Sequence, residues 1–236
     1  MSLQAQAVVL DLDGTLVDTL GDFTVALNRC MAELGWPALS QQWVAQAVGK
    51  GSEHLIRSVL QHQLSQEAVK GVGCACPALT VDAYYPRMWS AYQQHYRDIN
   101  GQFSQAYPGV EQGLQLLREQ GLRMACVTNK PLDFAQGLLD KLGLSGYFQV
   151  VYGGDSFERK KPDPLPLLKA CEALDTAVEH TLMVGDSVND AQAAQAAGLP
   201  LVLMTYGYNH GQDIRQTPAL AWLDRLDQIG SCLALR

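Results

Sequence analysis

The sequence has no apolar run long enough to cross a membrane and no broad excess of positive charge. A membrane span needs about 18–20 consecutive apolar residues, whereas the first apolar run, residues 7–10, ends at an aspartate. The formal net charge is −7, which argues against an extended surface for nucleic acid. We therefore expect a cytoplasmic protein, monomeric or homodimeric, with no secretory leader, membrane anchor or nucleic-acid partner.

Cysteine lacks the spacing of a metal site or a disulfide framework. The six cysteines are scattered over 236 residues, a distribution typical of free thiols in a reducing compartment. Cys74 and Cys76 form one close pair, but no second pair of cysteines or histidines with ligand spacing accompanies it. A zinc site is therefore not expected, and the sequence assigns no role to Cys74 and Cys76.

Apolar residues make up 47% of the chain, and their pattern changes along it. Beyond about residue 105, strands are predicted over 122–129, 147–154, 180–186 and 199–206, and helices over 131–143, 163–174 and 187–198. Asp163 is expected to cap a helix that begins at Pro164, and Gly198 to end the last helix. The strand runs are apolar throughout rather than alternating, which predicts a parallel sheet covered on both faces, a doubly wound α/β fold.

The segment 20–98 has a different pattern. Its apolar residues recur at helical spacing, with little sign of strands. We therefore predict a helical cap domain over 18–100, inserted after the first strand into an α/β core domain formed by 1–17 and 101–236.

Polar side chains follow the predicted strands where each strand ends. Asp11 and Asp13 come directly after the first apolar run, Thr128 and Asn129 after the next strand, and Asp186 after a third. In open α/β sheets, ligands bind beyond the carboxyl ends of the strands. Carboxylates so close together repel each other, so they need a cation, hydrogen-bond donors or open water to stay ionised.

These segments resemble the motifs of the haloacid dehalogenase superfamily. The resemblance covers essentially the whole chain and rests on DLDGTLVDT (11–19), VTN (127–129), KKPDP (160–164) and GDSVND (185–190), in that order. It implies a Rossmann-like core, with the helical insert as the cap.

The resemblance also implies roles for individual residues. Asp11 would be the nucleophile that forms an aspartyl-phosphate. Asp13 would protonate the leaving oxygen and then activate the hydrolytic water. Lys161 would stabilise the nucleophile and the developing charge. Thr128 and Asn129 would donate hydrogen bonds to the phosphate.

The resemblance assigns Mg²⁺ as the cofactor. Its ligands would be the carboxylates of Asp11 and Asp186 and the backbone carbonyl of Asp13, since magnesium prefers oxygen. Asp190 would hold order around the metal or the lysine. It also lies three residues after Ser187, a capping-box spacing, and both roles are compatible.

Asp13 favours phosphate-ester chemistry, because dehalogenases and phosphonatases of the superfamily lack an aspartate at this position. The segments VTNKP (127–131) and TYGYNHGQDI (205–214) are similar to bacterial phosphoglycolate phosphatases. This implies a phosphatase acting on a small phosphate monoester, 2-phosphoglycolate first. The alternatives are a sugar-phosphate mutase of the β-phosphoglucomutase type and a broad phosphatase for nucleotides or sugar phosphates.

The cap offers basic side chains for a substrate carboxylate. Lys50, His54 and Arg57 lie in AVGKGSEHLIRSVL (47–60), which is similar to the cap of that group. Lys50 and Arg57 are predicted to bind substrate by charge-assisted hydrogen bonds. The alternative is that this helix face is solvated.

Overall fold

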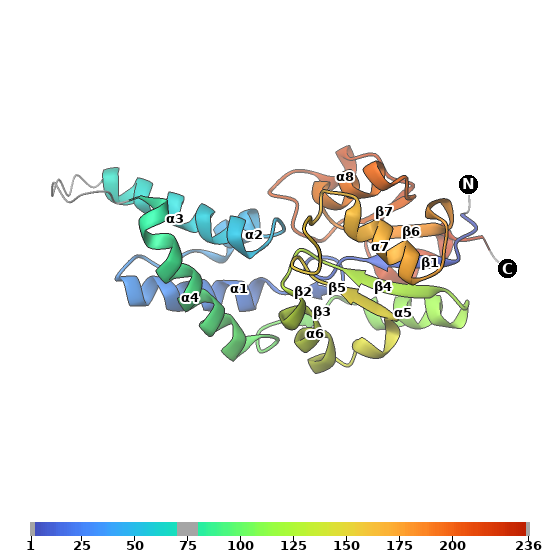
Figure 1. Cartoon of the computed structure of the whole chain (residues 1–236), viewed down its shortest axis with the longest axis horizontal. Coiled ribbons are helices and arrows are strands. Elements are labelled where there is room, and N and C mark those ends of the chain that lie inside the picture. The colour runs from blue at the N-terminus through green and yellow to red at the C-terminus, as the bar shows by residue number, and fades with distance from the viewer. Residues whose placement is uncertain (1–2, 70–79, 235–236) are drawn as a thin grey trace.

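The computed structural model describes residues 3–69 and 80–234. Figure 1 shows a lobe of helices on one side and a lobe built around a parallel sheet on the other. The predicted α/β class is confirmed. None of the described helices is both long and apolar enough to span a membrane. Cys74 and Cys76 lie outside the described residues.

The sheet has six strands in the order β5-β4-β1-β6-β7-β8, and every neighbouring pair is parallel. The strands are β1 (Ala7–Leu10), β4 (Arg123–Val127), β5 (Val150–Tyr152), β6 (Thr181–Gly185), β7 (Leu201–Met204) and β8 (Ala221–Leu223).

The strand order places a switch point beside β1. The chain runs outward from β1 through β4 to β5, then returns to the other side of β1 as β6. Leu10, the last residue of β1, is in register with Cys126 and Val184. The three central strands therefore end at one level, and ligand sites of such sheets lie in the crevice beyond this level.

Helices cover both faces of the sheet. Figure 1 shows α7 (Leu165–Ala173) and α8 (Val188–Ala197) on one side, and α5 (Val110–Glu119) and α6 (Leu132–Lys141) on the other. Alternate residues of β1 belong to the two cores: Val8 and Leu10 to one, Ala7 and Val9 to the other. Both faces of the strand are buried, which explains its continuous apolar sequence.

Some element boundaries differ from the predictions. β5 is shorter than 147–154, because 145–147 form a 3₁₀ turn, η1 (Ser145–Tyr147). The predicted start of α7 at Pro164 is wrong by one residue: Pro164 is the cap and Leu165 the first helical residue. Asp163 still accepts the backbone N–H of Leu165 at 2.9 Å. Gly198 ends α8 in the left-handed conformation, as predicted.

The helical insert is confirmed as helical and has its own core. It contains α1 (Leu20–Leu34), α2 (Gln41–Ala47), α3 (Ser52–Val69) and α4 (Val81–Ile99). Buried side chains from these helices form one cluster that includes Leu27, Leu60 and Tyr92. The domain limits at residues 18 and 100 stay a prediction.

A two-stranded ribbon connects the insert to the sheet. β2 (Val17–Asp18) pairs antiparallel with β3 (Gln105–Ala106), so the chain leaves and returns side by side. Asp18 accepts the N–H of Leu20 at 3.1 Å and the hydroxyl of Tyr208 at 2.5 Å. The loop after β7 is thereby tied to the entrance of the insert.

Candidate active site

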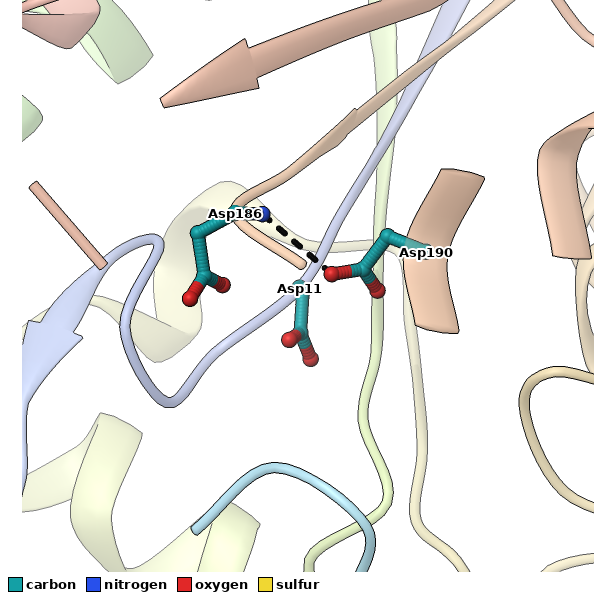
Figure 2. Close-up of side chains that lie close together, drawn as sticks. All are labelled: Asp11, Asp186 and Asp190. Atoms are coloured by element: carbon teal, nitrogen blue, oxygen red, sulfur yellow. Dashed lines mark hydrogen bonds between the residues drawn. The ribbon is translucent and has the colours of Figure 1, made fainter. Parts of the chain in front are cut away.

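Three carboxylates meet beyond the ends of β1 and β6. Asp11 follows β1, Asp186 follows β6, and Asp190 lies in the first turn of α8. Each offers an oxygen within 4.8 Å of the oxygens of the other two. Figure 2 shows the three side chains close together, with Asp11 between the other two. The topology therefore brings together residues separated by more than half of the chain.

A buried lysine neutralises part of this charge. Lys161 Nζ lies 2.8 Å from Asp11 Oδ1 and 2.7 Å from Asp190 Oδ1, and the residue is 3% exposed. Burial opposes the charged ammonium, but Asp11 and Asp190 outweigh it and raise the pKa of Lys161. Lys161 therefore stays protonated between the two carboxylates.

One lysine does not balance three carboxylates. Burial raises the pKa of Asp11 to about 7, even though Lys161 opposes this shift. Burial, followed by repulsion from Asp190 and Asp11, raises the pKa of Asp186 well above its usual value. Asp11 Oδ1 is buried, and among the described residues its one polar contact is the 2.8 Å ion pair with Lys161. The site is therefore suited to a further cation.

Asp186 is held by two hydrogen bonds from other segments of the core. Thr15 Oγ1 donates to its Oδ1 at 2.7 Å, and the backbone N–H of Tyr208 donates to its Oδ2 at 2.6 Å. Gly14 has φ +89, and a Cβ built on it would lie 2.3 Å from Asp186 Oδ2. The turn after Asp13 thus requires glycine at position 14.

Asp190 has little capacity left for a metal. Its Oδ2 accepts from the backbone N–H groups of Asp186 and Ser187 and from Ser187 Oγ, while its Oδ1 accepts from Lys161. Ser187 and Asp190 form a capping box at the start of α8, so the capping interpretation is confirmed. The role of Asp190 beside a metal stays a prediction.

Asp13 is not part of the group of three carboxylates and pairs with a second buried lysine. Lys130 Nζ lies 2.9 Å from its Oδ1 and 3.2 Å from its Oδ2, and also donates to the hydroxyl of Tyr96 at 2.7 Å. Lys130 is 4% exposed. Sequence reasoning assigned no role to Lys130 or Tyr96. The available signal was a lysine directly after Thr128-Asn129, but its burial depends on the distant helix α4.

A pocket joins Asp11 to Asp13 and the cap. It is also lined by Thr128, Asn129 and Lys130 from the core, and by cap residues from α1, α3, α4 and the loop 48–51. Its free space is about 30 Å³, enough for one or two waters. The predicted nucleophile, acid and phosphate-binding residues therefore share one pocket.

Asn129 links this pocket to the loop that carries Lys161. Its Nδ2 donates to the backbone oxygen of Lys161 at 2.9 Å and to that of Gly49 at 3.5 Å. Gly49 O also accepts from Asn189 Nδ2 at 3.1 Å. The cap loop therefore rests directly on the core.

The structure does not bring Lys50 and Arg57 into this pocket. They line a separate open hollow together with Lys160 and Lys161. Arg57 is engaged within the cap, with its guanidinium 3.2 Å from a carboxylate oxygen of Glu53 and also paired with Asp82. Their contact with substrate stays a prediction.

Comparison with known proteins fits this geometry. A family model of haloacid dehalogenase-like hydrolases matches residues 8–204. The chain belongs to this family. The predicted family membership, and with it the prediction of a hydrolase, is confirmed. The matched range extends from β1 to β7 and includes every motif on which the resemblance was based.

Named relatives of this hydrolase are similar over nearly their whole length. The phosphoglycolate phosphatase of Thiobacillus denitrificans is 41% identical over 214 residues, 91% of this chain and 89% of that protein. The phosphoglycolate phosphatase of Nitrosococcus oceani is 38% identical over 234 residues, 99% of each chain. A crystal structure of a predicted phosphoglycolate phosphatase from Haemophilus somnus superposes with a TM-score of 0.89, 30% identity and 97% coverage of each chain.

Proposed function

We propose that this hydrolase is a magnesium-dependent phosphatase that converts 2-phosphoglycolate to glycolate and phosphate through an aspartyl-phosphate on Asp11. The observation that carries the proposal is the placement of Asp11. It directly follows β1, pairs with Lys161 at 2.8 Å and shares a pocket with Asp13. The phosphoglycolate phosphatases among its relatives support the choice of substrate.

Asp11 would attack phosphorus with its carboxylate. The nucleophile must be ionised, and burial works against this by raising its pKa to about 7. Lys161 Nζ opposes that shift from 2.8 Å away. The same ammonium would stabilise negative charge on the transferring phosphoryl group, since it is already fixed in place by Asp190.

The oxygen atoms present fit a magnesium ion. Asp11 Oδ1 has no hydrogen-bond partner, and each oxygen of Asp186 accepts only one hydrogen bond from the described residues, so lone pairs remain. Both oxygens of Asp190 are engaged. We therefore assign the ion to Asp11 and Asp186, with the backbone carbonyl of Asp13 as the family resemblance implies. Bound there, Mg²⁺ would neutralise charge on the phosphoryl oxygens.

Asp13 would act as the proton carrier. It lies in the same pocket as Asp11, and its side chain is 10% exposed. It would give a proton to the leaving glycolate oxygen in the first step and take one from the attacking water in the second. Thr128, with its hydroxyl group, and Asn129 line the pocket and would contact the phosphate oxygens.

The cap would control access. The loop 48–51 lines the pocket and contacts Asn129 and Asn189 of the core through Gly49, so its movement would open a path for the substrate. Once closed, the loop would keep bulk water away from the nucleophile and strengthen electrostatic contacts in the pocket.

The proposal is tested by a panel of phosphate esters assayed for free phosphate in ¹⁸O-water. We expect the highest kcat/KM for 2-phosphoglycolate, ¹⁸O in the released phosphate, and no turnover with excess EDTA. Interconversion of glucose phosphates without ¹⁸O uptake would identify a mutase instead. Similar kcat/KM values for nucleotides and sugar phosphates would identify a broad phosphatase. Full turnover with excess EDTA would exclude the magnesium site.

A further inference from the structure

Lys130 is a buried lysine that the proposed chemistry does not use. Its ammonium contacts both oxygens of Asp13 and the hydroxyl of Tyr96. It also lies over two aromatic rings, 4.6 Å from the centroid of Phe23 and 4.7 Å from that of Tyr96. Phe23 and Tyr96 belong to α1 and α4 of the cap. One core side chain thus sits in an aromatic cage formed by the cap.

A buried lysine at 4% exposure needs a compensating interaction. The carboxylate of Asp13 supplies one here, and the ring faces of Phe23 and Tyr96 add favourable cation–π contacts. Lys130 thus has contacts in the pocket besides Asp13. It therefore suits a site that exchanges one carboxylate partner for another.

Lys130 has the one basic side chain among the described residues that line the pocket. Lys161 is held between Asp11 and Asp190, and Arg57 is paired with Glu53 and Asp82 outside the pocket. Among the described residues that line the pocket, Lys130 is therefore the cation available to a second anionic group of a substrate whose phosphorus sits at Asp11.

We propose that Lys130 is the residue that recognises the carboxylate of the substrate, and that Asp13 occupies this cation while the pocket is empty. The inference rests on the proposed function and names the residue that selects its substrate. An ammonium has three donors, so Lys130 can keep Tyr96 and turn its other donors from Asp13 to the incoming carboxylate.

The exchange couples recognition to chemistry. While Lys130 donates to both oxygens of Asp13, that side chain faces the lysine rather than the leaving oxygen. A substrate carboxylate that takes over Lys130 releases the Asp13 side chain to turn toward the ester. Phosphate esters without a carboxylate leave the Lys130–Asp13 pair in place, so selection does not depend on the phosphate contacts at Asp11.

The test compares Lys130→Met with the wild type on 2-phosphoglycolate and on ethyl phosphate, which lacks the carboxylate. Since a charge-assisted hydrogen bond is lost for one ester only, the ratio of their kcat/KM values should fall at least about tenfold. The matched control is Lys169→Met, an exposed lysine on α7 that pairs with Glu172, where the ratio should not change.

A binding measurement separates recognition from turnover. In an Asp11→Asn background, calorimetric affinity for 2-phosphoglycolate should weaken at least about tenfold on adding Lys130→Met, while affinity for ethyl phosphate is retained. Circular dichroism checks that the variants fold. Lys130→Arg keeps the positive charge, so its ratio of kcat/KM values for the two esters should lie closer to that of the wild type than the ratio of Lys130→Met. If the methionine variant does not fold, the arginine variant takes its place in the test.

An equal loss for both esters would overturn the inference and make Lys130 a positioning residue for Asp13. An unchanged ratio, or a ratio that falls instead in a Lys50→Met/Arg57→Met variant, would overturn it as well and place the carboxylate elsewhere. If the proposed function itself is wrong, the wild-type protein will show similar kcat/KM values for 2-phosphoglycolate and ethyl phosphate. This result is distinguishable from any effect of the Lys130 variants.

Discussion

Two buried lysines pair with three of the four aspartates of the site. Lys161 contacts Asp11 and Asp190, whereas Lys130 contacts Asp13. Breaking a buried ion pair by removing one partner costs about 3–5 kcal/mol, because the other charge is left without compensation. Substitutions in the site should therefore keep an acceptor for each lysine where possible, and asparagine is preferable to alanine in place of aspartate.

The first prediction concerns the nucleophile. Asp11→Asn should abolish turnover, because the amide is nearly isosteric but a poor nucleophile. Folding should be retained, because the change removes a carboxylate that is costly to bury. Burial raises the pKa of this carboxyl group to about 7. Phosphate release and thermal melting measure the two effects. Asp175→Asn, at an aspartate with a fully exposed side chain, is the control; turnover near the wild-type rate in Asp11→Asn would refute the role.

The second prediction concerns Asp13. Asp13→Asn keeps an oxygen for Lys130 but removes the acid, so turnover of an alkyl phosphate should fall by about 10²–10⁴-fold. An aryl phosphate needs less protonation of its leaving group and should lose less in the first step. The aspartyl-phosphate should then accumulate and appear as a burst of aryl alcohol. Equal losses for both esters without a burst would count against acid–base catalysis by Asp13.

How far the site could be predicted depends on where each residue lies in the sequence. Asp11 and Asp186 follow apolar strands, so their meeting at one edge of the sheet follows from the fold class. Lys130 and Tyr96 could not be assigned in this way. Their contact joins a core loop to a cap helix, and only the packing of α1 and α4 over the sheet decides that Lys130 is buried.

At the scale of elements, the start of α8 connects stability with chemistry. The capping box stabilises the first turn of the helix through Ser187 and Asp190. Asp190 holds Lys161 with its other oxygen. The same side chain thus caps a helix and holds the lysine that lies beside Asp11.

The third prediction separates these two effects. Ser187→Ala should lower the free energy of unfolding by about 0.5–2 kcal/mol through the lost cap. It should also lower kcat, because Asp190 loses the hydroxyl that fixes it. Ser40→Ala is the matched control: Ser40 caps α2, away from the site, by accepting from the N–H of Trp43. Urea denaturation and kcat are measured for both; a kcat loss no larger in Ser187→Ala than in Ser40→Ala would contradict the positioning role.

Element types were easier to predict than their ends. Continuous apolar runs identified the buried parallel strands, and helical spacing identified the insert, because both patterns report burial over several residues. The shorter β5 and the later start of α7 depend on local turns that periodicity does not register. The packing of the insert against the core was not predictable, since it depends on contacts such as that of Asn189 with Gly49.

At the scale of the whole molecule, the buried carboxylates couple stability to pH and to metal. The pKa of Asp11 is raised from 3.8 to about 7, and that of Asp186 is raised as well, because of burial. Between pH 3.8 and about 7, Asp11 of the metal-free folded protein keeps a proton that the unfolded chain has released. This contribution to stability is therefore fully present below about pH 4 and is lost as the pH rises through about 7.

The fourth prediction follows from this sign. For each carboxyl group that keeps its proton in the folded state, the free energy of unfolding of the metal-free protein should decrease by about 1.4 kcal/mol per pH unit between about pH 4 and 7. Mg²⁺ binds the ionised carboxylates and so competes with the proton. Saturating Mg²⁺ should therefore raise the Tm more at pH 8 than at pH 5, with each kcal/mol worth about 2–4 °C in a chain of this size.

Thermal melting with and without Mg²⁺ at both pH values measures this difference. Asp186→Asn is the control, because it removes a proposed magnesium ligand and one of the carboxyl groups whose pKa is raised. The Tm of this variant should respond little to Mg²⁺ at either pH. Comparing shifts within each pH cancels the titration of groups away from the site. An equal Tm rise at pH 5 and pH 8 would mean that the ion does not replace protons on Asp11 and Asp186, and would place the magnesium site elsewhere.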